Sequence, residues 1–152
     1  MALVLACAGS DPAGAADSHA LAVTAAVLSK NICRFQTTGP TAVAFGTINP
    51  AATAAVTTNI TLQYRCNGSD AVASWAVTSD DGLYESGAGQ PRMRHATVTT
   101  AFLPYTLTFP AAGTVSRNVV TNMSVGATVT PANFANALAG AYADTLVLTI
   151  TP

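Results

Sequence analysis

Residues 16–28 read Ala16-Asp17-Ser18-His19-Ala20-Leu21-Ala22-Val23-Thr24-Ala25-Ala26-Val27-Leu28, and residues 146–152 read Leu146-Val147-Leu148-Thr149-Ile150-Thr151-Pro152. Both stretches have apolar side chains at every second position, which is typical of a strand with one buried face. The first carries almost no charge and precedes Cys33, the first cysteine of the expected domain. The second is expected to have no later segment to pair with its outer edge. Together they predict a β domain that lends one strand to a neighbour and receives another.

The same alternation continues along the chain. Ile60, Leu62, Tyr64 and Cys66 alternate with polar residues and indicate a half-buried strand. Further strands are expected at 41–46, 73–77, 103–109, 123–129 and 146–150, with a bulge at Gly126. A turn is expected at 80–82, a loop at 85–97 and one helical turn within 131–139. Short strands separated by turns, with no helical layer, predict an all-β sandwich.

Composition limits the function. The chain has 152 residues, enough for one domain with its own core, and only 9% of them are charged, with a formal net charge of −1. The six Lys and Arg residues are scattered, which disfavours nucleic-acid binding. No apolar run approaches the roughly 18 residues of a membrane span. So low a charge fits a surface that is covered by partners.

The N-terminus resembles an export signal. Residues 1–8 are apolar, and Ala13-Gly14-Ala15 is a small-residue cleavage site. No basic region precedes the apolar stretch, so residues 1–15 are interpreted as a truncated signal peptide. A second cleavage site at Ala6-Cys7-Ala8 and a lipoprotein at Cys7 remain alternatives. The N-terminal extension is then residues 16–29, and the domain is residues 30–152.

The cysteines predict a disulfide. Cys7 belongs to the expected signal, which leaves Cys33 and Cys66 as a pair in an exported chain. A metal site is disfavoured, because His19 and His95 are far apart in sequence and no Cys-x-x-Cys spacing occurs.

No catalytic motif is apparent. Asp80, Asp81 and Glu85 could form a carboxylate or calcium site, but a solvated turn explains them more simply. His95 is interpreted as a loop histidine and Trp75 as a core residue. There is no G-x-S-x-G elbow and no glycine-rich phosphate loop. We therefore expect no enzyme activity, no metal and no cofactor.

Several motifs, taken in order, resemble one family. They are Cys33-x-Phe35, Val43-Ala44-Phe45-Gly46, Ile60-x-Leu62-x-Tyr64-x-Cys66, Arg92-Met93, Leu103-Pro104-Tyr105-Thr106-Leu107 and Gly140-Ala141-Tyr142-Ala143-Asp144-Thr145-Leu146-x-Leu148-x-Ile150. Over residues 20–152 the chain resembles the spore coat protein U domain family, which includes the subunits of archaic, Csu-type chaperone–usher pili.

The resemblance implies an incomplete immunoglobulin-like sandwich that lacks its last strand. A periplasmic chaperone would supply a strand during export, and an outer-membrane usher would exchange it for the N-terminal extension of the next subunit, at the cell surface. The residues at the family's donor-strand positions are Leu21, Val23, Ala25 and Val27. The alternative is that this segment is the domain's own first strand.

Two departures bear on the role of the subunit. The signal lacks its basic start, and the chain passes quickly through residues 110–113, where many relatives are longer. No extra adhesin domain is seen, which favours a shaft or adaptor position in a pilus that serves adhesion and biofilm formation. A secreted spore or cell-surface coat protein is the first alternative, and a carbohydrate-binding or hydrolytic sandwich is the second.

Overall fold

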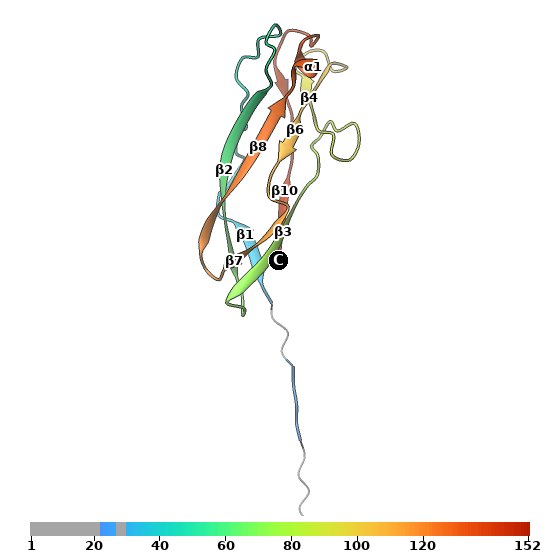
Figure 1. Cartoon of the computed structure of the whole chain (residues 1–152). Coiled ribbons are helices and arrows are strands. Elements are labelled where there is room, and N and C mark those ends of the chain that lie inside the picture. Colours follow the sequence, from blue (N-terminus) through green and yellow to red (C-terminus); the bar gives the residue numbers. More distant parts are fainter. Residues whose placement is uncertain (1–21, 27–29) are drawn as a thin grey trace, which may run out of the picture.

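The computed structural model describes residues 22–26 and 30–152 of the chain (Figure 1). Its elements, in chain order, are β1 (Ile32–Phe35), β2 (Val56–Asn67), β3 (Val72–Ser79), β4 (Arg92–His95), β5 (Phe102–Pro104), β6 (Thr106–Thr108), β7 (Ala112–Ser116), β8 (Val120–Val129), α1 (Pro131–Phe134), β9 (Tyr142–Ala143) and β10 (Leu148–Thr151). The prediction of an all-β fold is confirmed. None of the helices in the described parts is long and apolar enough to cross a membrane.

The strands form two layers. One layer is a four-stranded antiparallel sheet in the order β1-β2-β8-β6, in which β2 and β8 pair over ten register positions from Val56↔Val129 to Arg65↔Val120. The other layer consists of two three-stranded sheets, β10-β3-β7 and β5-β4-β9. The C-terminal segment joins these two sheets, because β9 pairs with β4 and β10 pairs with β3. The result is an elongated sandwich (Figure 1).

The chain changes layers at Tyr105. The strand β5 ends at Pro104 and pairs with β4, whereas β6 begins at Thr106 and pairs with β8 in the opposite layer. Proline suits the end of a strand, because it cannot donate to a ladder. Tyr105 therefore lies between the layers, where its ring is buried.

The core is divided into two clusters. The first contains Tyr64, Trp75, Val77, Met123 and Val125, and the rings of Tyr64 and Trp75 meet edge to face at 5.1 Å. This confirms that Trp75 is a core residue. The second cluster contains Leu103, Tyr105, Ala127, Val129 and Phe134. Leu107 is partly buried and packs against both clusters.

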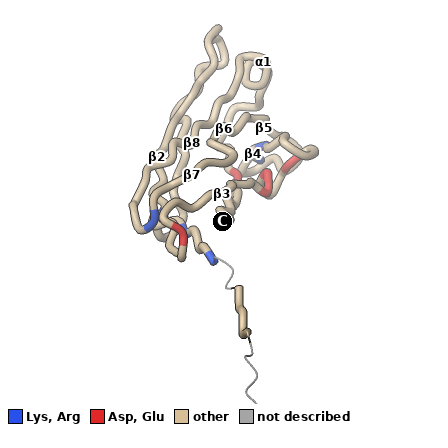
Figure 2. The backbone as a smooth tube through the Cα atoms, turned by 60° about the horizontal axis from the view of Figure 1, so that its bottom comes forward, with Lys and Arg blue, Asp and Glu red and all other residues tan. Residues whose placement is uncertain are grey.

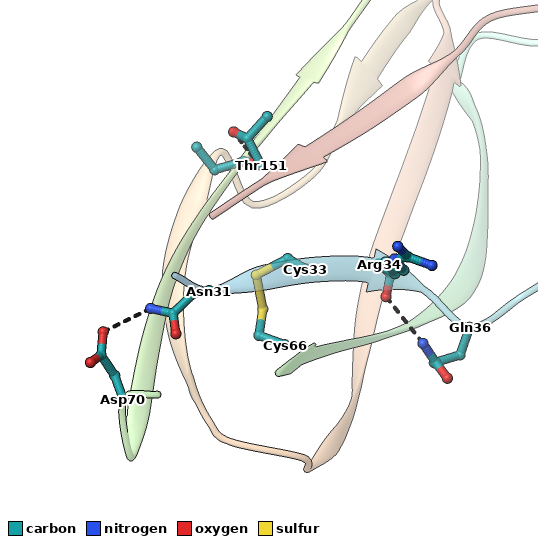
Figure 3. The surroundings of a disulfide bond; sticks show 8 residues. Asn31, Cys33, Arg34, Gln36, Cys66, Asp70 and Thr151 are labelled. Atoms are coloured by element: carbon teal, nitrogen blue, oxygen red, sulfur yellow. Dashed lines mark hydrogen bonds between the residues drawn. A yellow bond between two sulfur atoms is a disulfide. The ribbon is translucent and has the colours of Figure 1, made fainter. Parts of the chain in front are cut away.

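The predicted disulfide is present between Cys33 and Cys66 (Figure 3). It joins β1 to β2 at a register pair, and both cysteines are buried. Next to it, the Asn31 side chain donates a hydrogen bond of 2.8 Å to the Asp70 carboxylate. The short strand β1 is thus fixed at its start by a covalent bond and a side-chain hydrogen bond.

Two local predictions were wrong, and the single strand predicted at 103–109 is divided at Tyr105 into β5 and β6. Residues 41–46 form no strand, since no described strand pairs with them. Gly126 marks no bulge, because it keeps a regular register opposite Asn59, whose side chain lies over it together with that of Thr108. A Cβ on Gly126 would lie 2.6 Å from Asn59 Oδ1, so the glycine is needed for close packing.

The predictions of a loop at 85–97 and of a loop histidine at His95 were wrong, because residues 92–95 form the strand β4 and His95 is its one buried residue. His95 Nδ1 accepts hydrogen bonds from the backbone N–H groups of Val98 (3.0 Å) and Thr97 (3.2 Å). Its Nε2 lies 3.1 Å from the Ala139 carbonyl, so the neutral ring with its proton on Nε2 fits these partners. The predicted helical turn is confirmed as α1.

An open apolar groove as the candidate functional site

A long groove of about 1260 Å³ opens between the two layers. One wall is the segment 37–48 and the other is the segment 138–148. The floor is formed by inward residues of both layers, among them Leu62, Leu103, Leu107, Val125 and Ala127. Most of this lining is apolar, so the groove exposes surface that would normally be buried.

The first wall is a strand-like segment that pairs with no strand among the described residues. The last backbone hydrogen bond that holds it to β2 runs from the Gln36 N–H to the Gln63 carbonyl at 2.7 Å. Beyond it, the half-buried side chains of Val43, Phe45 and Ile48 pack against the second core cluster. The Phe45 ring meets the Tyr105 ring edge to face at 6.3 Å. This wall keeps the alternation of a strand, which explains why the sequence predicted one.

The second wall is the outer edge of the C-terminal segment. Both β9 and β10 are edge strands of their sheets. The carbonyls of Ala141, Thr145 and Val147 accept hydrogen bonds from the sheet side, from Ala96, Leu83 and Asp80 respectively. Peptide groups alternate in direction along a strand. Those of Tyr142, Asp144, Leu146 and Leu148 therefore point toward the groove, as a row of donors and acceptors that a further strand could pair with.

Apolar side chains of both layers that line the groove are only half-buried. The apolar side chains with which the C-terminal segment lines the groove are Tyr142, Leu146 and Leu148, and each is partly exposed although it packs against one of the core clusters. The same holds for Ile60 and Leu62 on the opposite layer. A strand laid in the groove would cover these residues and join the two clusters into one core.

One carboxylate lies within the mostly apolar lining. Asp144 lies between Tyr142 and Leu146 on the second wall, and its Oδ2 accepts a hydrogen bond of 2.9 Å from the Tyr105 hydroxyl. Its Oδ1 accepts one of 3.0 Å from the Leu83 N–H. Burial, together with the hydrogen bond to Asp144 and the negative charge of that carboxylate, raises the pKa of Tyr105. The phenol therefore stays neutral and donates.

The carboxylates of Asp80 and Asp81 accept hydrogen bonds from the backbone. Asp80 Oδ1 accepts from the N–H groups of Gly82 (3.1 Å) and Val147 (2.8 Å), and Asp81 Oδ2 accepts from Gly89 N–H at 2.7 Å. Within the described residues no group of three or more His, Cys, Asp or Glu side chains could hold a metal ion.

Figure 2 shows charged residues near the end of the domain from which residues 22–26 extend and around the loops beside β4.

The donor-strand residues fall partly outside the described structure. Leu21 and Val27 lie outside the described residues. Val23 and Ala25 belong to the described segment 22–26, which is part of none of the three sheets (Figure 1), and Val23 is 84% exposed. Their assignment to a donor strand stays a prediction.

Comparisons with known proteins identify the family. The spore coat protein U domain model matches residues 18–149, and no curated protein matches the chain. One matching solved structure comes from work described as "Chaperone-tip adhesin complex is vital for synergistic activation of CFA/I fimbriae biogenesis". It shares 16% identity with a TM-score of 0.47, and the match covers 77% of this chain and 40% of that one. On the extent of the family match, the chain belongs to the spore coat protein U domain family.

Proposed function

We propose that this protein is a structural subunit, in a shaft or adaptor position, of a surface pilus that polymerises by donor-strand exchange. The observation that carries the proposal is the groove, which combines an open apolar lining with a strand edge that pairs with no other strand in the described parts of the chain. Adding a strand to a free sheet edge is an established mode of peptide recognition, and chaperone–pilin complexes are among its known examples.

The extension at residues 17–29 has the composition that the groove requires. Leu21, Val23, Ala25 and Val27 occupy one face of an extended segment, and Ala22, Thr24 and Ala26 occupy the other. Residues 21–27 span about 20 Å when extended, and the groove edge from Tyr142 to Leu148 also spans about 20 Å. The segment therefore fits along the edge with its apolar face toward the floor.

Burial of the apolar face would stabilise the complex substantially. Each buried Leu or Val side chain contributes about 1.5–3 kcal/mol, so Leu21, Val23 and Val27 together contribute about 5–9 kcal/mol before the cost of ordering the strand. The same insertion would cover the half-buried rims of both core clusters.

The partners follow from this mode of assembly. Neighbouring subunits would exchange N-terminal strands in a homo- or heteropolymer. A periplasmic chaperone would cover the groove beforehand, and an outer-membrane usher would direct the exchange as the chain is exported to the cell surface. The pilus would serve adhesion and biofilm formation.

The test uses a full-length chain whose own donor strand is disabled by Val23→Asp and Val27→Asp. A synthetic peptide of residues 17–29 is titrated into it, and the melting temperature is measured. At a peptide concentration of about 100 Kd the stabilisation is about 2.7 kcal/mol, which raises the melting temperature by about 5–10 °C.

Two control peptides make the test specific. A Thr24→Asp peptide carries its charge on the outward face and should stabilise the domain as well as the natural one. A Val23→Asp peptide carries the same charge inward and should not stabilise it. If the natural peptide leaves the melting temperature unchanged, the groove is not filled by this strand. The coat-protein alternative would then be favoured.

A further inference from the structure

We propose that Asp144 sets the register of strand exchange, by requiring the small residue Ala25 of the incoming strand as its neighbour. The proposal rests on the proposed function, and it names which residue of the neighbour's extension pairs with which residue of the groove.

Asp144 is the one acidic residue in either wall segment, 37–48 or 138–148, and neither segment contains Lys, Arg or His. Its carboxylate is held in place by the Tyr105 hydroxyl and the Leu83 N–H. Gly82 packs directly against it, and a side chain at Gly82 would collide with the carboxylate. The carboxylate thus has a fixed position and cannot swing away when a strand enters.

A side chain next to this carboxylate changes its hydration. Directly opposed residues on neighbouring strands have Cβ atoms about 4.5–5.5 Å apart. A Val or Leu at that distance would displace water from a charged group without giving it a new hydrogen bond, which is unfavourable. Alanine displaces the least water. Ala25 is the small residue among the four inward residues of the donor segment.

One antiparallel register satisfies this requirement and fills the remaining positions with apolar pairs. With Ala25 opposite Asp144, the other pairs are Val27 with Tyr142, Val23 with Leu146 and Leu21 with Leu148. A shift of two residues in one direction places Val23 opposite Asp144, and a shift in the other direction places Val27 there. A parallel strand with Ala25 opposite Asp144 would place Leu21 opposite Gly140, which offers no side chain to pack against.

The backbone of the groove edge is compatible with this register. The peptide groups of Asp144 point toward the groove, because those of its neighbour Thr145 point toward the sheet, where the Thr145 carbonyl accepts from Leu83. Ala25 and Asp144 would then be a hydrogen-bonded pair, and Thr24 and Thr145 a non-hydrogen-bonded pair with Cα atoms about 4.5 Å apart. That distance lies within the range for a disulfide.

Disulfide trapping in the full-length chain therefore reads the register directly. In a Cys7→Ser background, Thr24→Cys is combined in turn with Ala143→Cys, Thr145→Cys or Val147→Cys. All three groove-edge positions are exposed on the outer face, so these substitutions leave the core unchanged. After assembly and mild oxidation, the Thr24→Cys/Thr145→Cys chain should give a reducible covalent ladder on a denaturing gel, several-fold more abundant than with the other two.

The outcomes separate this inference from the proposed function. A stronger ladder with Ala143→Cys or Val147→Cys would overturn the register while leaving strand exchange in place. A cross-link within a monomer would overturn it too, because the strand would then come from the same chain. No cross-link in any variant, together with no stabilisation by the 17–29 peptide, would reject strand exchange itself.

A second measurement tests the role of the carboxylate. In binding to the donor-disabled chain, an Ala25→Val peptide should bind about tenfold more weakly than the natural peptide. Asp144→Asn in the groove, which keeps an acceptor for the Leu83 N–H, should remove most of that difference. An Ala25→Lys peptide should still bind, whereas a Val27→Lys peptide should not, because only the side chain at position 25 would face a carboxylate. Equal losses for the two lysine peptides would contradict the pairing.

Discussion

Removing the Cys33–Cys66 bond should destabilise the domain by about 4 kcal/mol. The two cysteines are 33 residues apart in sequence. In the chain-entropy model, opening a loop of that length returns about 12–13 cal/mol/K to the unfolded chain, which is about 3.8 kcal/mol at 25 °C. Replacing both buried cysteines by alanine removes the cross-link without leaving a buried thiol or hydroxyl without a partner.

The assay is urea unfolding of the donor-disabled chain, followed by circular dichroism, with and without Cys33→Ala/Cys66→Ala. With a urea dependence of about 2 kcal/mol per molar, the midpoint should fall by about 2 M while the slope is unchanged. The unsubstituted chain in reductant is the matched control and should shift by a similar amount. A shift of less than about 0.5 M in both samples would refute the reasoning, because the bond would then not constrain the unfolded chain.

The loss should also reach the groove. The strand β1 has only four residues, and immediately beyond it the chain leaves β2 to form the first wall. Without the disulfide, β1 is held to β2 by a short backbone ladder, so its end should fray and the wall should lose its fixed starting point. The 17–29 peptide should therefore bind the cysteine-free chain more weakly at temperatures where that chain is still folded.

Three further outcomes are expected. Burial and the hydrogen bond to a carboxylate raise the pKa of Tyr105 in the folded protein above its value of 10.0 in the unfolded chain. The contribution of Tyr105 to stability is therefore fully present below pH 10 and is lost as the pH rises above it. Replacing the residue by Tyr105→Phe should make the free energy of unfolding depend less on pH in this alkaline range. Gly140→Ala would place a methyl group against the buried His95 ring, and the melting temperature should fall by several degrees as the ring is displaced. Phe45→Ala should weaken binding of the 17–29 peptide at least tenfold, whereas Val119→Ala, at an exposed site outside the groove lining, should leave it unchanged.

The sequence predicted the fold where alternation and pairing coincide. Ile60, Leu62, Tyr64 and Cys66 face the core on β2 as expected, and the cysteine pair forms the expected bond. Residues 41–46 have the same alternation, yet they form no strand. A strand is defined by its hydrogen-bonded partner, which the pattern of one segment does not reveal.

The strand β4 escaped prediction for a different reason. Its residues Arg92 and Arg94 suggest a solvated loop, but their guanidinium groups stack on the rings of Phe102 and Tyr84, each with 4.3 Å between the guanidinium carbon and the ring centre. His95 is buried because backbone groups satisfy both of its ring nitrogens. The contact between Tyr105 and Asp144 was equally hidden, since 39 residues separate them in sequence.

The groove also gives a physical reason for a partner before assembly. The chain carries few charges, and its groove exposes apolar side chains beside a strand edge that no other described strand pairs with. Low charge and an open edge both favour nonspecific association, so an empty groove would be prone to aggregation. If the groove is filled by strand exchange as proposed, a temporary occupant must offer an extended strand with alternating apolar side chains, as the neighbouring subunit's extension would, and must bind weakly enough to be displaced. Under the proposed function, a chaperone strand with a bulky residue opposite Asp144 would meet both conditions, because the unfavourable contact with the carboxylate would be relieved when Ala25 takes its place.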